Sequence, residues 1–253
     1  MIQIIDLTKR YGNFEAVSHI NLEVNSGEIF GFLGPNGAGK TTTIKIMAGL
    51  LKPTSGRVII DGNDIIKNPV EAKSVVGFIP DSPFLYEKLT GKEFLRFVAD
   101  LYRVSTNSYE DKISELLDLF ELNEWGDELI EGYSHGMKQR LVMSSALIHN
   151  PKVIIVDEPM VGLDPKGARV VKETFKTIAS LGTTIFMSTH TLEIAEEMCD
   201  RIAIIQQGEV IAMGTMEELR KKVENTKDQS LESVFLSLTG QEEMIEIIQV
   251  LRK

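Results

Sequence analysis

The chain has 253 residues, of which 43% are hydrophobic and 25% are charged, and its formal net charge at pH 7 is −10. These proportions are ordinary for a globular protein, while the acidic balance argues against nucleic-acid binding and against direct adsorption to anionic lipid. The single cysteine, Cys199, excludes an intrachain disulfide and a cysteine metal cluster.

No apolar run approaches the ~20 residues of a membrane helix. The first residues also lack the basic region and the long apolar core of a signal peptide. We therefore expect a cytoplasmic protein.

The first 80 residues alternate short apolar runs with turns. This pattern predicts strands at 2–7, 14–17, 20–24, 29–33, 57–61 and 75–79, with a helix ending near Gly49 and a short helix beginning at Pro69. The early short strands favour an antiparallel sheet. Tyr11 lies in a turn between two of them, where its ring is placed to stack on adenine, although a tyrosine in a hairpin is more often a packing or surface residue.

A glycine-rich loop follows the strand at 29–33. It reads Gly34-Pro35-Asn36-Gly37-Ala38-Gly39-Lys40-Thr41-Thr42, which matches G-x-x-x-x-G-K-[ST] and precedes a predicted helix. Such a loop lets backbone N–H groups surround a phosphate, and the helix N-terminus adds partial positive charge. Lys40 is expected to reach the β- and γ-phosphates, and the Thr41 hydroxyl to bind Mg²⁺. The motif should occur by chance in roughly one chain per hundred of this length.

The pattern becomes helical between Asp81 and Asn150. Thr90 and Glu93 have the spacing of a capping box, and apolar residues at helical spacing mark helices at 94–101, 113–120 and 137–148. We infer an inserted helical lobe over 81–150. Phe84-Leu85-Tyr86, which follows the nearby prolines Pro80 and Pro83, either packs in a core or forms a docking surface, and we favour the surface.

The segment Ser134-His135-Gly136-Met137-Lys138-Gln139-Arg140 begins the third of these helices. Its serine hydroxyl, backbone N–H groups and helix dipole make a second anion-binding helix start. Taken alone, Ser134 would be a simple N-cap.

Strands and helices alternate again after Asn150. The pattern predicts strands at 152–157 and 183–187, a helix from Pro165 capped by Asp164, a helix capped by Thr191, and a hairpin of 201–206 with 209–213. This alternation favours a mostly parallel α/β sheet. Beyond Thr215 the chain is predicted to be helical, with apolar faces at 231–238 and 244–251.

The strand at 152–157 ends in an acidic residue, and a second acidic residue follows it directly. Asp157 at the strand end would hold Mg²⁺, and Glu158 would polarise an attacking water. His190 follows the strand at 183–187 and would contact a γ-phosphate. Each of these residues alone has a structural explanation, and the upstream phosphate-binding loop is what favours the chemical one.

Together these motifs resemble the nucleotide-binding subunit of an ABC transporter, in that family's order and over nearly the whole chain from Ile2 to about Thr215. In the resemblance, 34–42 is the Walker A loop, 134–140 the signature, and Asp157-Glu158 the Walker B acid and catalytic base. Tyr11 matches the adenine-stacking aromatic, Asp81 the Q-loop position, Asp164 the D-loop and His190 the switch histidine. The segments 80–89 and 231–240 resemble parts of bacterial exporter subunits.

The resemblance implies a RecA-like P-loop NTPase α/β core with an antiparallel β edge subdomain and an inserted helical subdomain. The core would comprise 1–80 and 151–215, the helical subdomain 81–150, and a C-terminal helical extension 216–253. The catalytic residues would be Glu158, His190 and Lys40. ATP would be bound by Tyr11, Asn36, Gly37, Ala38, Gly39, Lys40, Thr41, Thr42, Ser134 and Gly136, and Mg²⁺ by Thr41, Asp157 and Asp81.

The resemblance also implies partners. Two cassettes, identical or different, would close head-to-tail on ATP, so that Ser134 of one completes the phosphate shell begun by Lys40 of the other. The pair would dock on a separate transmembrane subunit at the inner face of the cell membrane and power transport, with export favoured.

The sequence departs from the family pattern at two places. Asp81 replaces the Q-loop glutamine, and the usual L-S-G-G-Q becomes Tyr133-Ser134-His135-Gly136-Met137. These departures bear on hydrolysis more than on ATP binding. They leave open a regulatory cassette with little hydrolysis. An ABC-fold ATPase that works outside transport is the other alternative to the transporter subunit.

Overall fold

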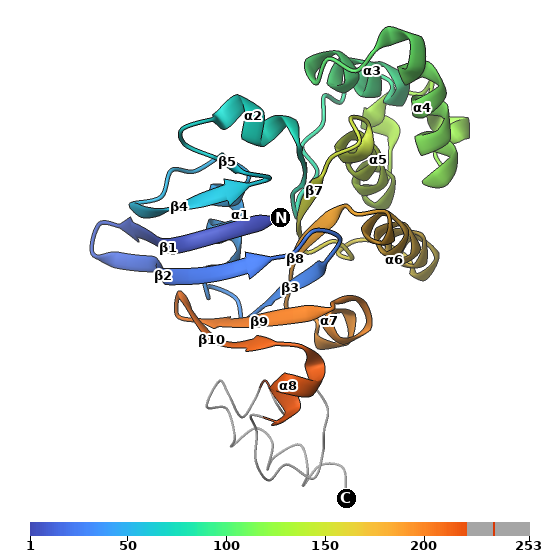
Figure 1. The fold of residues 1–253 in the computed structure, drawn as a ribbon. Coiled ribbons are helices and arrows are strands. Elements are labelled where there is room, and N and C mark those ends of the chain that lie inside the picture. The colour runs from blue at the N-terminus through green and yellow to red at the C-terminus, as the bar shows by residue number, and fades with distance from the viewer. Residues whose placement is uncertain (222–234, 236–253) are drawn as a thin grey trace, which may run out of the picture.

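The computed structural model describes residues 1–221 and 235, apart from the side chains of residues 106–108. Over these residues the chain forms a four-stranded sheet, a six-stranded sheet and helices packed around them (Figure 1). The expected pair of apolar faces at 231–238 and 244–251 lies outside the described residues except for Phe235.

The four-stranded sheet is antiparallel, with the strand order β2-β1-β4-β5. Its strands are β1 (Ile2–Tyr11), β2 (Phe14–Val24), β4 (Ser55–Ile60) and β5 (Asn63–Asp64). The expectation of two separate strands at 14–17 and 20–24 is wrong. His19 has a φ of 47° and the pairing with β1 shifts register there, so a bulge bends β2 without ending it. Nδ1 of His19 lies 2.7 Å from Oδ1 of Asp6 on β1.

The six-stranded sheet has the order β10-β9-β3-β8-β7-β6. It is parallel from β9 to β6, and β10 joins β9 as an antiparallel hairpin, which confirms both sequence predictions. Its strands are β3 (Ile29–Leu33), β6 (Val76–Ile79), β7 (Val153–Asp157), β8 (Thr184–Thr189), β9 (Arg201–Gln206) and β10 (Glu209–Gly214). Strands β3, β7 and β8 are buried along their whole length, as their apolar sequences require.

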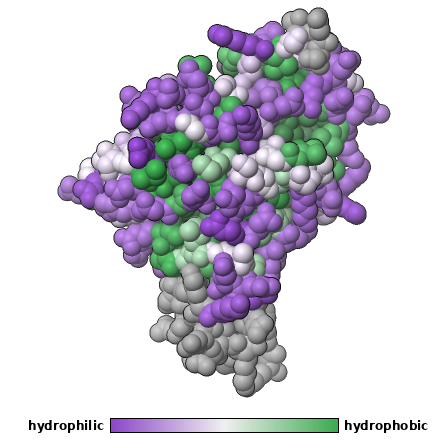
Figure 2. Space-filling view, in the orientation of Figure 1, coloured by the Kyte–Doolittle hydropathy of each residue, from purple (hydrophilic) through white to green (hydrophobic). Residues whose placement is uncertain are grey.

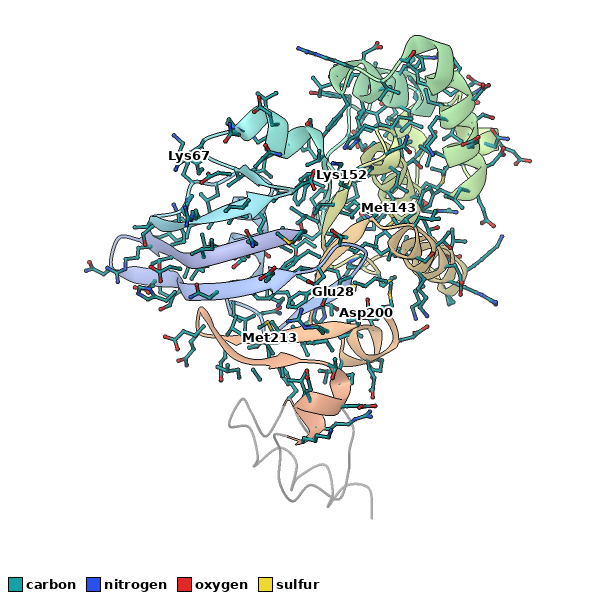
Figure 3. All side chains as sticks on the ribbon, in the orientation of Figure 1. Glu28, Lys67, Met143, Lys152, Asp200 and Met213 are labelled. Carbon is teal, nitrogen blue, oxygen red and sulfur yellow. The ribbon has the colours of Figure 1, made fainter. Side chains whose placement is uncertain are left out.

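Polar side chains fix the start of β9 beside β3. The backbone N–H of Ile29 donates to Oδ2 of Asp200 at 2.9 Å, and Nη1 of Arg201 donates to Oε1 of Glu28 at 3.0 Å. Figure 3 labels Glu28 and Asp200 at this position. These contacts align β9 with β3, the strand that leads to the glycine-rich loop.

The helices flank the sheets. They are α1 (Lys40–Met47), α2 (Pro69–Ser74), α3 (Gly91–Leu101), α4 (Thr106–Leu119), α5 (His135–Leu147), α6 (Pro165–Ser180), α7 (Leu192–Met198) and α8 (Met216–Lys221), with short 3₁₀ turns at Asn123–Trp125 and Ile130–Gly132. Helix α1 begins at Lys40, three residues before the apolar run that predicted it.

The predicted helix caps are mostly present. Thr90 and Glu93 form the capping box of α3, Ser134 caps α5, and Asp164 caps α6. Thr191 occupies the N-cap position of α7, but its side chain makes no capping hydrogen bond. Its hydroxyl is therefore not the cap that the sequence predicted.

Two large cores meet at β7. Val153 and Ile155 belong to the core that lies between the two sheets around α1. Ile154 and Val156 belong to the core that joins the opposite face of the six-stranded sheet to α3, α4, α5 and α6. Because alternate residues of β7 are packed on both sides, Asp157 at its end is held in a well-defined position.

Among the described residues, no helix is long and apolar enough to cross a membrane. On the face shown in Figure 2, hydrophilic residues predominate and hydrophobic ones form smaller groups between them.

Candidate active site

A cleft of about 420 Å³ opens beside the glycine-rich loop, where the parallel strands β3, β7 and β8 end. Ligands bind at this edge of parallel α/β sheets. The cleft is lined by Tyr11, Phe14, Ala16, Asn36, Gly37, Gly39, Lys40, Thr41, Thr42, Asp81, Asp157, Glu158 and His190. The fold therefore brings together most of the residues that the sequence singled out, from segments far apart in the chain.

Gly39 turns the loop into α1. Its φ is +107°, and a Cβ at this position would lie 2.5 Å from the carbonyl oxygen of Ala16 on β2. Only glycine fits such a position. Helix α1 begins at the next residue without a side-chain cap, so the N–H groups of its first turn are available to an anion in the cleft.

The ammonium group of Lys40 is folded back onto its own loop. Nζ donates to the carbonyl oxygens of Gly34 at 2.7 Å and Pro35 at 3.1 Å. Burial lowers the pKa of Lys40, and the nearby carboxylates of Glu158 and Asp157 act in the opposite direction. A phosphate in the cleft would give this partly desolvated cation a stronger partner than two carbonyl groups.

Asp157 ends β7 with its side chain almost fully buried. The hydroxyl of Ser188, at the paired position on β8, donates to Oδ1 of this carboxylate. Sequence reasoning did not identify Ser188, because strand pairing alone places it there. The second carboxylate oxygen of Asp157 accepts no hydrogen bond from the described residues, so it can accept one from a ligand or a metal-bound water.

Glu158 and His190 form a pair at the rim of the cleft. Nδ1 of His190 lies 2.7 Å from Oε1 of Glu158, and the Glu158 side chain is the more buried of the two. Glu158 has a φ of +51°, and its N–H donates to the carbonyl oxygen of Ser188 at 3.2 Å. A non-glycine residue held at positive φ is uncommon and often marks a functional site. This conformation points the carboxylate toward His190.

Two aromatic rings stand at the other end of the cleft. Tyr11 and Phe14 occupy paired positions on either side of the turn between β1 and β2, and their side chains are 50% and 64% exposed. Nζ of Lys9 lies 5.1 Å from the centroid of the Tyr11 ring. Sequence reasoning named Tyr11 but missed Phe14. The two-residue turn at Gly12-Asn13 was the available signal, because it pairs positions 11 and 14.

Asp81 lies at the rim as well. It follows β6 and the intervening Pro80, and its Oδ1 accepts a hydrogen bond from the N–H of Ser82 at 2.7 Å. Among the described residues, no cluster of three His, Cys, Asp or Glu side chains forms a metal site. A metal held by Thr41, Asp157 and Asp81 would therefore need oxygens from a phosphate ligand or water to complete its shell.

Ser134 and Gly136 do not line this cleft. Ser134 is exposed at the start of α5, and its hydroxyl accepts from the N–H of Met137 at 3.3 Å. Asp164 caps α6 through the N–H of Gly167 and is also absent from the cleft. The signature segment therefore presents its helix start away from the phosphate-binding loop of its own chain.

Two other histidines, His149 and His19, have structural partners. His149 stacks on Tyr102 with ring centroids 3.8 Å apart, and its Nε2 lies 3.1 Å from the carbonyl oxygen of Val76. Burial lowers the pKa of His149 to about 4. His19 pairs with Asp6 as described above, so neither histidine takes part in the cleft.

Comparisons with known proteins agree with this geometry. Residues 17–161 match the family model described as ABC transporter. The linearmycin resistance ATP-binding protein LnrL of Bacillus subtilis is 39% identical over 219 residues, which are 87% of this chain and 70% of that protein. A solved ATP-binding subunit of an ABC transporter has a TM-score of 0.89 and 33% identity, and the match covers 94% of this chain and 99% of that one. A dimeric bacterial ABC transporter cassette has a TM-score of 0.77 and 28% identity, covering 85% and 98%.

Proposed function

The chain belongs to the ABC transporter family, and on that premise we propose that it is the ATP-hydrolysing subunit of an exporter whose membrane-spanning part is a separate protein. Its ATP binding and ATPase activity follow from the family and from the cassette fold. The observation that carries the proposal is the shared cleft of Tyr11, Lys40, Asp157 and Glu158. The name of LnrL, a resistance protein, supports export.

The nucleotide would lie along the cleft. Its base would stack against Tyr11 and Phe14, and its phosphates would accept hydrogen bonds from N–H groups of the loop at 36–42. Lys40 would leave the carbonyl oxygens of Gly34 and Pro35 and turn to the β- and γ-phosphates. This rearrangement exchanges neutral acceptors for charged ones, which strengthens the hydrogen bonds.

Hydrolysis would depend on Glu158 and His190. The carboxylate of Glu158 would orient the attacking water and accept its proton, and His190 would keep the carboxylate in place beside the γ-phosphate. The contact between the two side chains supports these roles. Both residues also argue against a regulatory cassette that hardly hydrolyses ATP.

Magnesium fits the oxygen donors of the cleft. The Thr41 hydroxyl, the Asp157 carboxylate and the Asp81 carboxylate line the same space, and oxygen is the ligand that Mg²⁺ prefers. The ion would neutralise phosphate charge when bound. Ser188 would orient Asp157 toward it by occupying one carboxylate oxygen.

A second cassette, a copy of this chain or a related one, would complete each site. Ser134 is exposed, Gly136 is partly exposed, and both lie outside the cleft of their own chain, so they could reach the γ-phosphate bound to another cassette. The existence of a dimeric cassette among the structural relatives supports this arrangement. The start of α5 would then act as the second anion-binding helix terminus.

The membrane partner would dock near residues 80–89. Phe84 is 86% exposed, the most of any large hydrophobic side chain among the described residues. Leu85 packs against the core of the helical lobe, and Tyr86 meets Phe97 edge to face at 5.5 Å. Of the three residues, Leu85 and Tyr86 therefore make packing contacts, and Phe84 is the one that we assign to docking. This contact would hold the subunit at the cytoplasmic face of the membrane.

The proposed division of the chain follows the same reasoning. Residues 1–80 and 151–215 would carry the nucleotide cleft, 81–150 the helical lobe with the signature, and 216–253 an extension. An ABC-fold ATPase outside transport remains the alternative, and the resistance and transporter names of the relatives weigh against it.

Steady-state hydrolysis of Mg·ATP by the purified chain tests the proposal. We expect measurable turnover that the Lys40→Ala variant loses, together with weaker ATP binding and an unchanged fold. Equal turnover in the two proteins would contradict the assignment.

A further inference from the structure

His135 contacts the loop that follows strand β7. A Cβ built on Gly162 would lie 2.2 Å from Cδ2 and 2.5 Å from Nε2 of His135, so the imidazole fills the space beside this glycine. A Cβ on Gly136 would lie 3.2 Å from the carbonyl oxygen of Gly162. The start of α5 therefore rests on Gly162 through a side chain as well as through backbone.

The loop around Gly162 is short, and hydrogen bonds restrain it near both ends. It runs from Glu158 at the end of β7 to Asp164 at the N-cap of α6. The N–H of Val161 donates to the carbonyl oxygen of Glu158 at 3.2 Å, and Oδ1 of Asp164 accepts from the N–H of Gly167. Because the loop is short and restrained, a displacement of Gly162 should also change the position of Glu158.

His135 also stands next to Ser134, the residue expected to reach the ATP of the second cassette. The usual glycine of the signature at this position would leave the space beside Gly162 without the imidazole. The imidazole adds a rigid group between a residue that serves one ATP and the loop whose Glu158 serves the other.

We propose that His135 is a positioning residue that couples the two ATP sites of the dimer. Its ring holds the Gly162 loop against the start of α5, so that closure of Ser134 on one ATP sets the position of Glu158 at the other. This inference rests on the proposed function. Such coupling requires that the position of one element biases the position of the other, and the contact between His135 and Gly162 supplies that link.

The first test compares His135→Gly with His135→Phe. Phenylalanine keeps a ring over Gly162, whereas glycine removes it. We expect ATP hydrolysis by the unmodified chain and by His135→Phe to rise sigmoidally with ATP, with a Hill coefficient between 1 and about 2 for two sites. His135→Gly should show a coefficient near 1, with kcat within about tenfold of the unmodified chain.

The outcomes separate the two proposals. A His135→Gly enzyme that keeps the sigmoidal dependence, or an unmodified chain that is active but hyperbolic, overturns the coupling role and leaves the ATPase assignment intact. An unmodified chain without ATPase activity overturns the proposed function and this inference with it.

The second test uses Gly162→Ala, which introduces the Cβ that His135 excludes. Its φ of +79° adds backbone strain, so Gly62→Ala is the matched control: Gly62 has a φ of +80°, with nothing within 4 Å of a built Cβ. We expect Gly162→Ala to lower turnover about tenfold and His135→Gly to restore part of the loss. Gly62→Ala should hydrolyse ATP normally in either background. The absence of any rescue at Gly162 would overturn the contact that the inference requires.

Discussion

The Glu158 carboxylate lies 2.7 Å from Nδ1 of His190, at the ends of the neighbouring strands β7 and β8. The positive φ of Glu158 and its hydrogen bond to the carbonyl oxygen of Ser188 direct the side chain toward that contact. Two residues that lie 32 positions apart in the sequence are thus brought together by strand pairing. The pair is the part of the cleft on which hydrolysis should depend most.

Replacing His190 by alanine should slow hydrolysis more than it weakens ATP binding. The carboxylate of Glu158 loses the group that orients it, so we expect kcat to fall by about a hundredfold or more, with the Kd for ATP changed only a few-fold. Turnover and equilibrium binding of a fluorescent ATP analogue measure the two quantities. His19→Ala is the matched control, because its imidazole pairs with Asp6 outside the cleft. Equal turnover in the two histidine variants would contradict the role of His190.

Removing the aromatic ring of Tyr11 or of Phe14, which we propose to stack on the adenine base, should weaken ATP binding. Stacking of a base on an aromatic ring contributes about 1–3 kcal/mol, so Tyr11→Ala and Phe14→Ala should each raise the Kd for ATP several-fold or more. Tyr11→Phe and Phe14→Tyr keep a ring and should bind nearly as well as the unmodified chain. Isothermal titration of the four variants checks this. Unchanged affinity in Phe14→Ala would restrict the base site to Tyr11.

Replacing Phe84 should have a different effect from replacing Tyr86, although both are exposed aromatic residues of the segment 80–89. Phe84→Ser should reduce recovery of the chain with membrane vesicles that contain its transporter, and leave basal ATPase and thermal stability unchanged. Tyr86→Ser removes the edge-to-face contact with Phe97 and should lower the melting temperature by a few degrees, since such contacts contribute about 1 kcal/mol. Loss of ATPase and of vesicle binding together in Phe84→Ser would show that Phe84 packs in the folded core.

The chain should lose stability between neutral pH and pH 4 through His149. Its pKa in the folded protein is about 4 because of burial, whereas the unfolded chain has an ordinary histidine pKa of about 6.5. The unfolded state therefore binds the proton first, and stability falls as pH drops from 6.5 toward 4. The full shift corresponds to about 3 kcal/mol, and solvent screening at the partly exposed ring reduces it.

The His149→Phe variant isolates this contribution. Phenylalanine retains a ring on Tyr102 but cannot be protonated, so its denaturation midpoint should depend less on pH over the same range. Urea unfolding at several pH values measures the difference. Parallel pH profiles for the two proteins would show that His149 titrates normally in the folded state.

The sequence predicted the parts of the site that are local. The strand, loop and helix around Lys40 and the acids after β7 each have short patterns with one physical explanation, and the structure places them together. Other features depend on contacts between distant segments. Strand register puts Ser188 on Asp157, and only the folded chain shows His135 lying on Gly162. Lys40 turned back on its loop is a state of the cleft that no residue pattern encodes.

Trapping of the Glu158→Gln variant with Mg·ATP tests the central claim most directly. Glutamine keeps the size of the side chain but cannot accept the proton of water, so ATP should bind and persist, and size-exclusion chromatography should show an ATP-dependent dimer. Adding Lys40→Ala to this variant should abolish the dimer by preventing productive ATP binding. If Glu158→Gln hydrolyses ATP at the normal rate, or remains a folded monomer in saturating ATP, the account of a two-cassette ATPase with Glu158 as its base is contradicted.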